Sequence, residues 1–221
     1  MKLAIIGATG GIGRQLLEQS VDAGHDVTAV VRDPSRLSRP VSSVAVDLVH
    51  PDWNALEAAV GGRDAVLSGL GPRSNSDVGV ASAGTAAMVK AMQATGTRRL
   101  VLVSAAPIGT VPSPSHPHPP RHDPGDGFFM RHFFSPLTKL ALRNQYRDLA
   151  AMEEIVRDSQ LDWTMVRPPR LTDKPPTGRY RTAYGHNLRR GFLISRADVA
   201  DLMLRVIGDP TSIGQIVGIA N

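Results

Sequence analysis

Three glycines near the start of the chain are spaced for binding a phosphate group. Gly7, Gly10 and Gly13 follow the apolar stretch Lys2–Ile6 at the spacing G-x-x-G-x-x-G, and a helical pattern of apolar residues begins at about Gly11. In a strand–turn–helix unit, the first glycine permits the tight turn, the second lets the backbone approach a pyrophosphate, and the third lets the helix lie close to the strand. The N–H groups that open the helix then hold the anion. This turn predicts a dinucleotide site, with a merely flexible turn as the alternative.

The end of the second apolar stretch, 26–31, bears on which dinucleotide is bound. A carboxylate at this place accepts the ribose 2′-hydroxyl of NAD, whereas the 2′-phosphate of NADP calls for a guanidinium group. Here Arg32 follows the stretch directly, and Arg36 adds a second cation one turn further on. Asp33 follows Arg32 directly, so the alternative is a solvated loop in which the two are paired. We expect NADPH rather than NADH.

Two further segments are expected at the carboxyl edge of the sheet, where the ligand of an open α/β sheet lies. Asp47 and Leu48 follow the third strand and can contact adenine, although an ordinary strand end would look the same. The glycine-rich stretch 69–73 follows the fourth strand and either contacts the cofactor or makes a turn. From these segments, the residues that we predict to bind the cofactor are Gly7, Thr9, Gly10, Gly11, Ile12, Gly13, Arg32, Arg36, Asp47, Leu48, Gly69, Leu70, Gly71 and Arg73.

Candidate substrate-binding side chains lie further along the chain. Ser104 follows the fifth strand and can donate to a carbonyl or to the nicotinamide amide, with a plain strand cap as the alternative. Tyr146 opens a helical pattern and either faces the pocket or anchors the helix half-buried. Glu153 and Glu154, on the same helix, are interpreted as a solvated face rather than as acid catalysts.

The segment after Ser104 is rich in proline, histidine and aromatic residues. His116, His118 and His122 could share a metal ion, but the prolines stiffen the chain and no carboxylate cluster or cysteine supplies further ligands, so we predict no metal. An aromatic cluster at 128–134 is interpreted as core, as a substrate lid or as a protein contact. We find no nucleophile elbow, zinc-protease motif or Walker lysine.

Composition predicts one globular unit. The chain has 221 residues, 42% of them hydrophobic, and no apolar run of membrane-spanning length, so we expect a single domain over 1–221 and no membrane contact. The absence of cysteine excludes disulfides and thiolate metal sites, and the first residues lack a signal-peptide pattern, so we expect a cytoplasmic protein. The net charge of +5 is spread without a lysine run, which argues against nucleic acid as a partner.

Strand and helix patterns alternate, which predicts an α/β fold: a Rossmann-like, doubly wound parallel sheet. The expected strands are 2–6, 26–31, 44–46, 64–69, 99–104, 163–167 and 215–219. The expected helices run from about 11 to 24, 52–60, 79–95, 128–142, 146–158 and 196–206. The stretches 105–127 and 170–191 are expected to be loop, and 105–142 forms a lid or interface insertion within the domain.

The chain resembles the atypical short-chain dehydrogenases/reductases of the NmrA-like, NAD(P)-binding group, and within it the NADPH-dependent flavin and biliverdin-IXβ reductases. The segments that carry the resemblance are 7–13, 30–37, 70–73, 104–105, 161–169, 177–180 and 194–200. It implies that Arg32, Arg36 and Arg73 hold the adenosine end of NADPH and that Ser104 faces the nicotinamide. It also implies that the loop at Pro168 and Pro169 helps to wall the reactive end of the cofactor. The resemblance therefore adds four residues to the predicted cofactor site: Ser104, Ala105, Pro168 and Pro169.

Two departures from the family pattern affect the chemistry. Typical members pair a tyrosine acid with a lysine four residues later, but here those positions hold Ala150, Tyr184 and Leu188, so alcohol dehydrogenation is not expected. The flavin reductases carry a histidine directly after the two prolines, where this chain has Arg170. An arginine can bind an anionic substrate but does not deliver a proton at neutral pH. The predicted catalytic residues are Ser104, Tyr146 and Arg170.

Two functions follow from these residues. The first is an NADPH-dependent oxidoreductase that transfers hydride to a conjugated small-molecule acceptor such as a flavin or quinone. The second is a non-catalytic NADP(H)-binding sensor of the NmrA-like type, in which the segment 105–142 changes its affinity for a partner protein; the same segment could form a homodimer contact. A cofactor-assisted rearrangement or dehydration is a third, weaker alternative.

Overall fold

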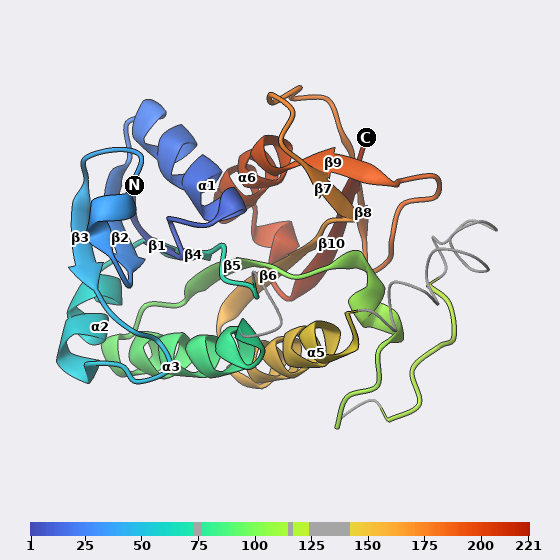
Figure 1. The fold of residues 1–221 in the computed structure, drawn as a ribbon, viewed down its shortest axis with the longest axis horizontal. Helices are drawn as coiled ribbons and strands as arrows, with labels where there is room; N and C mark the ends of the chain where they lie inside the picture. Colours follow the sequence, from blue (N-terminus) through green and yellow to red (C-terminus); the bar gives the residue numbers. More distant parts are fainter. Residues whose placement is uncertain (73–76, 115–116, 124–141) are drawn as a thin grey trace.

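The computed structural model describes residues 1–72, 77–114, 117–123 and 142–221. Its eight-stranded sheet has the order β3-β2-β1-β4-β5-β6-β10-β8, and its pairs are parallel except for β8 against β10 (Figure 1). In chain order these strands are β1 (Lys2–Ile6), β2 (Asp26–Val31), β3 (Ser42–Ala45), β4 (Ala65–Ser68), β5 (Arg99–Val103), β6 (Asp162–Arg167), β8 (Arg181–Tyr184) and β10 (Gln215–Ala220). A separate parallel pair joins β7 (Arg170–Thr172) to β9 (Leu193–Ser195).

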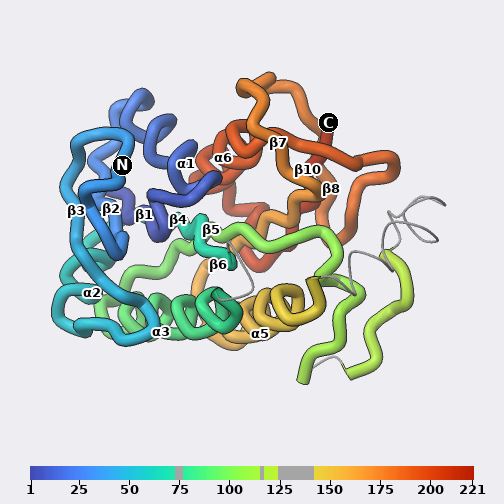
Figure 2. Tube along the Cα trace, in the orientation of Figure 1, coloured from blue at the N-terminus to red at the C-terminus, as the bar shows by residue number. Residues whose placement is uncertain are grey.

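Helices cover both faces of the sheet (Figure 2). One face carries α1 (Gly11–Asp22) and α6 (Arg196–Arg205), and the other carries α2 (Trp53–Val60), α3 (Val80–Thr95) and α5 (Arg143–Asp158). Alternate residues of β1 pack to opposite sides, Leu3 and Ile5 toward α1 and α6, Ala4 and Ile6 toward the other three helices. Because both sides are covered, the central strands are continuous apolar runs.

Local side-chain bonds fix where the helices begin. Asp52 accepts a hydrogen bond from the Ala55 amide at 3.1 Å and so caps α2, and Ser195 accepts one from Asp198 at 2.9 Å and caps α6. The start of α3 is capped by Asp148 of α5. Short 3₁₀ helices complete the described elements: η1 (Pro34–Arg36), η3 (Ala106–Thr110), η5 (Val206–Gly208) and η6 (Pro210–Ser212).

The doubly wound fold and every expected strand of the sheet are confirmed, but two of the expected loops are more regular than expected. The stretch 170–191 contains β7 and β8, and 105–127 contains η3. The strand β8 was missed because it lies at the sheet edge with exposed, mixed polar residues, so it has no apolar signal. The expected helix 128–142 falls almost entirely outside the described residues. Within the described ranges, no helix is both long and apolar enough to span a bilayer.

Candidate functional site

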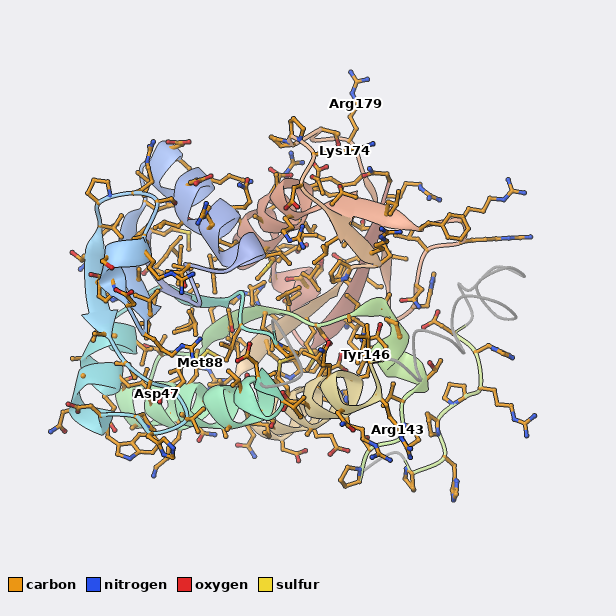
Figure 3. The ribbon with its side chains drawn as sticks, in the orientation of Figure 1. Asp47, Met88, Arg143, Tyr146, Lys174 and Arg179 are labelled. Atoms are coloured by element: carbon orange, nitrogen blue, oxygen red, sulfur yellow. The ribbon has the colours of Figure 1, made fainter. Side chains whose placement is uncertain are left out.

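A cavity of about 560 Å³ opens at the carboxyl ends of β1, β2, β4 and β5, where the strand order reverses on either side of β1. Figure 3 shows two of its lining residues far apart, Asp47 beside α3 and Tyr146 on α5. The residues from our predicted sites that line it are Gly7, Thr9, Gly10, Gly11, Ile12, Arg32, Arg36, Asp47, Leu48, Gly69, Leu70, Gly71, Ser104, Ala105 and Tyr146. The structure thus brings together residues from six separate parts of the sequence.

The glycine turn forms one wall of the cavity. Two of its positions, Gly7 and Gly13, do not accommodate a larger residue. Gly7 has a φ of +73°, and a Cβ on Gly13 would lie 2.1 Å from the Gly7 carbonyl oxygen. Gly13 is not part of the cavity lining; it lets α1 lie against β1. The N-cap of α1 is Gly10, no side chain caps it, and its first turn holds no acidic residue. Its N–H groups are therefore suited to an anion.

At the far end of the cavity, Arg32 and Arg36 are exposed and both line it. Asp33 does not pair with Arg32 among the described residues; its carboxylate accepts from the Ser35 amide at 3.0 Å and from the Ser35 hydroxyl at 2.6 Å, and so caps η1. These bonds from Ser35 hold the pKa of Asp33 below its ordinary value. Nearby, the carboxylate of Asp47 accepts from the Val49 amide at 3.1 Å.

At the opposite end, Ser104 and Tyr146 share a mostly apolar compartment. Ser104 is 7% exposed, and its hydroxyl donates to Oε1 of Glu153 at 2.6 Å. Tyr146 is half-buried, and burial raises the pKa of its phenol, which keeps that group protonated at neutral pH. Three further lining side chains are apolar, and they come from separate elements or loops: Val103, Leu149 and Leu171.

Behind Ser104 lies a buried ionic cluster. Glu153 is fully buried, so the interpretation of this residue as part of a solvated face is wrong. Arg167 donates from Nε to Oε1 at 2.8 Å and from Nη2 to Oε2 at 2.5 Å, and Arg157 donates to Oε2 at 2.6 Å. A buried carboxylate persists only with such compensation. The signal that could have revealed the cluster is Arg167 itself, a buried charged residue at the end of an apolar strand.

Other predicted site residues lie outside the cavity lining. Pro168 is buried and its carbonyl accepts from the Ala106 amide at 2.9 Å, and neither Pro168 nor Pro169 lines the cavity. Arg170 is exposed at the start of β7. Arg73, His116 and the aromatic stretch 128–134 fall outside the described residues. Among those described, no group of three or more metal-ligating side chains is placed to hold an ion.

Sequence reasoning missed several lining residues, of which Arg196 is the most telling. A Cβ on Gly11 would lie 2.6 Å from the Arg196 Cδ and Nε atoms, so the arginine lies directly against the glycine turn. It pairs with Asp173 at 2.6 Å, and a neighbouring hollow of about 410 Å³ is also lined by Arg14 and Lys174. Arg196 was noted only as part of a family segment, because it is distant from the turn in sequence.

These features define a class of protein. The volume suits a cofactor or small molecule, the glycine cradle and uncapped helix suit a pyrophosphate, and the two ends suit a charged and an aromatic group. The site is thus that of a dinucleotide-binding protein with a Rossmann-like fold. A family model described as NAD(P)H-binding matches residues 7–210, and the chain belongs to this NAD(P)H-binding family.

Comparisons with known proteins agree with this family. An uncharacterised protein of Mycobacterium tuberculosis is 34% identical over 106 residues, which cover 48% of this chain but only 12% of that protein. The anaerobillin reductase ChuY from Escherichia coli O157:H7 has a TM-score of 0.75 at 22% identity, with 100% of this chain and 97% of that chain covered. A short-chain dehydrogenase/reductase of Veillonella parvula, solved in complex with NADP, has a TM-score of 0.76 at 18% identity, with 100% and 94% covered. At 22% and 18% identity, these two structures show that the chain shares their fold. Both are named as oxidoreductases, and the family resemblance of the sequence implied the same fold.

Proposed function

We propose that the protein is an NADPH-dependent reductase that transfers hydride to a conjugated acceptor such as a flavin or quinone. The observation that carries the proposal is the continuity of one cavity. It joins two arginines that have no ion-pair partner in the described part of the chain, Arg32 and Arg36, to a compartment walled by apolar side chains around Ser104 and Tyr146. A 2′-phosphate suits the first end, and a nicotinamide ring with a flat acceptor suits the second.

In this proposal each part of the cavity has its own task. The N–H groups at the start of α1 hold the pyrophosphate, Arg32 and Arg36 hold the 2′-phosphate, and Asp47 with Leu48 borders the adenine. Gly71 has open space where a side chain would lie, which leaves room for the nucleotide, whereas Gly69 lies against the backbone of Gly13. The bound nicotinamide supplies the hydride, so the protein needs only to position it and the acceptor.

The reacting end supports reduction of an acceptor better than oxidation of an alcohol. The phenol of Tyr146 is protonated at neutral pH and can donate to an acceptor oxygen, but no lysine follows at the spacing that would activate it as a base. Val103, Leu149 and Leu171 keep water from the ring. Arg170, exposed and outside the lining, is given no part in this chemistry.

The proposal is tested by following NADPH oxidation with FMN, riboflavin and a series of quinones. We expect turnover with at least one acceptor, and slower reduction by the variant Tyr146→Phe with unchanged NADPH affinity. Tyr184→Phe is the matched control, because Tyr184 is exposed on β8 and does not line the cavity. Tight NADPH binding without turnover across the panel would refute the enzyme and favour the sensor, with 105–142 as its partner-binding segment.

A further inference from the structure

The hydroxyl group of Ser104 has only one hydrogen, and in the structure this hydrogen is donated to Glu153. Ser104 lines the cavity, yet its Oγ lies 2.6 Å from Oε1 of Glu153, which is fully buried and is not part of the cavity lining. An ionised carboxylate can only accept hydrogen bonds, so the serine must be the donor in this contact. What the hydroxyl has left for a ligand is its lone pairs.

Glu153 cannot easily release this hydrogen bond. Arg167 of β6 donates to both carboxylate oxygens, and Arg157 of α5 donates to one of them. Charge-assisted bonds of this kind are strong, and Glu153 is fully buried. The two arginines come from different elements, so packing of the fold holds both oxygens in place. The direction of the Ser104 hydroxyl is thus set before any ligand enters.

We propose that Glu153 is a positioning residue that makes Ser104 a hydrogen-bond acceptor toward the cavity, so that the site selects a ligand N–H at this point. The inference rests on the proposed function, under which the group at Ser104 is the nicotinamide carboxamide and its NH₂ is the donor. Ser104 is then neither an acid nor a donor to a substrate carbonyl. This narrows the two roles that the sequence left open for Ser104.

The test compares two nucleotides. NADP⁺ carries a carboxamide, and its 3-acetylpyridine analogue keeps the carbonyl but has a methyl group in place of the NH₂. For the wild type we expect NADP⁺ to bind about tenfold more tightly than the analogue, because the analogue leaves the buried Ser104 oxygen unpaired. For Ser104→Ala we expect both to bind equally. Calorimetry gives both dissociation constants, and their ratio does not respond to a general loss of stability.

A second variant tests Glu153 itself. In Glu153→Gln, the NH₂ group takes the former Oε1 place beside Ser104, because one arginine donor (Arg167 Nε) faces that place whereas two (Nη2 of Arg157 and of Arg167) face the former Oε2. The serine then accepts from the glutamine and turns its hydrogen to the cavity, so the preference for NADP⁺ falls about tenfold or reverses. Glu154→Gln is the matched control: it makes the same change one position along α5 and is expected to keep the wild-type ratio. A thermal melt identifies the folded variants.

The outcomes separate the two proposals. Equal binding of both nucleotides by the wild type, or an unchanged ratio in Ser104→Ala, overturns this inference and leaves the proposed function standing. A wild-type ratio in folded Glu153→Gln also overturns it, and if this variant does not fold, Ser104→Ala alone decides. Failure of the wild type to bind either nucleotide refutes the proposed function and this inference with it.

Discussion

The two ends of the cavity are built in opposite ways. At the Arg32 end, the arginines are exposed, lie within one short stretch of chain, and have no ion-pair partner among the described residues. At the Ser104 end, Ser104, Glu153 and Arg167 are buried, come from the end of β5, from α5 and from β6, and depend on one another through hydrogen bonds. An exposed end of this kind can change its ligand by single substitutions, whereas the buried end must change as a unit. The following variants test this difference.

The largest effect is expected at the buried end. Arg167→Leu removes the main partner of a fully buried carboxylate, and we expect the free energy of unfolding to fall by about 3–5 kcal/mol. Chemical denaturation measures this change. Arg170→Leu is the control, because Arg170 is exposed three residues away, and its stability should stay close to that of the wild type. Similar losses in both variants would show that the buried ion pair is not the source of the loss.

The second effect concerns the glycine turn, which lies between the two ends. Gly13→Ala places a methyl group 2.1 Å from the Gly7 carbonyl oxygen, where only backbone movement can relieve the clash. We expect a loss of at least about 1–3 kcal/mol in the free energy of unfolding and weaker binding of every nucleotide. Gly208→Ala, at a position with open space, should show neither change. Undisturbed nucleotide binding by Gly13→Ala would contradict the close approach described for this turn.

The third effect belongs to the exposed end alone. Arg32→Ala should weaken NADPH binding by about 1.5–3 kcal/mol, the range of a charge-assisted hydrogen bond, while NADH binding and protein stability hardly change. Fluorescence titration with both nucleotides gives the comparison. Equal losses for NADPH and NADH would refute the assignment of Arg32 to the 2′-phosphate.

The smallest effect is expected from Asp33→Asn. The amide still caps η1, but the negative charge beside the two arginines is gone, so NADPH should bind slightly more tightly at low salt, and less so as salt screens the charge. The lowered pKa of Asp33 means that the wild-type carboxylate is charged from neutral pH down to below its ordinary value. The gain should therefore persist as pH falls from 7 through the ordinary aspartate pKa of about 3.9, and disappear only below it, where the wild-type carboxylate becomes protonated. A gain that does not vary with salt would point to a cause other than charge.

Short-range patterns in the sequence were enough for the fold and for the exposed end of the site. The glycine turn, the strand ending at Arg32 and the helix cap at Asp52 each depend on residues within a few positions of one another. Glu153 was misjudged because its partners, Ser104 and Arg167, are distant in sequence and meet only when β5, β6 and α5 pack together. A single helix viewed alone gives a carboxylate no sign of what covers it.

Two other misses have the same origin. Arg196 reaches the glycine turn from α6, and Leu171 reaches the cavity from β7, a strand that lacks an apolar pattern of its own. The role expected for the two prolines at the reacting end came from family resemblance rather than from this chain. In this chain Pro168 accepts from Ala106 of η3 and neither proline lines the cavity, and the cofactor contact predicted for them stays a prediction.

The cap that α5 gives to α3 has a consequence for how the molecule opens. Asp148, two residues beyond Tyr146, accepts from the amides of Gly79, Ala81 and Ser82 at 2.9, 3.1 and 3.0 Å. These amides belong to the first turn of α3, which has no partner for them within its own ladder. Their protection from hydrogen exchange thus depends on the docking of another helix. Any motion that separates α5 from α3 would free these three amides together, before the rest of α3 unravels.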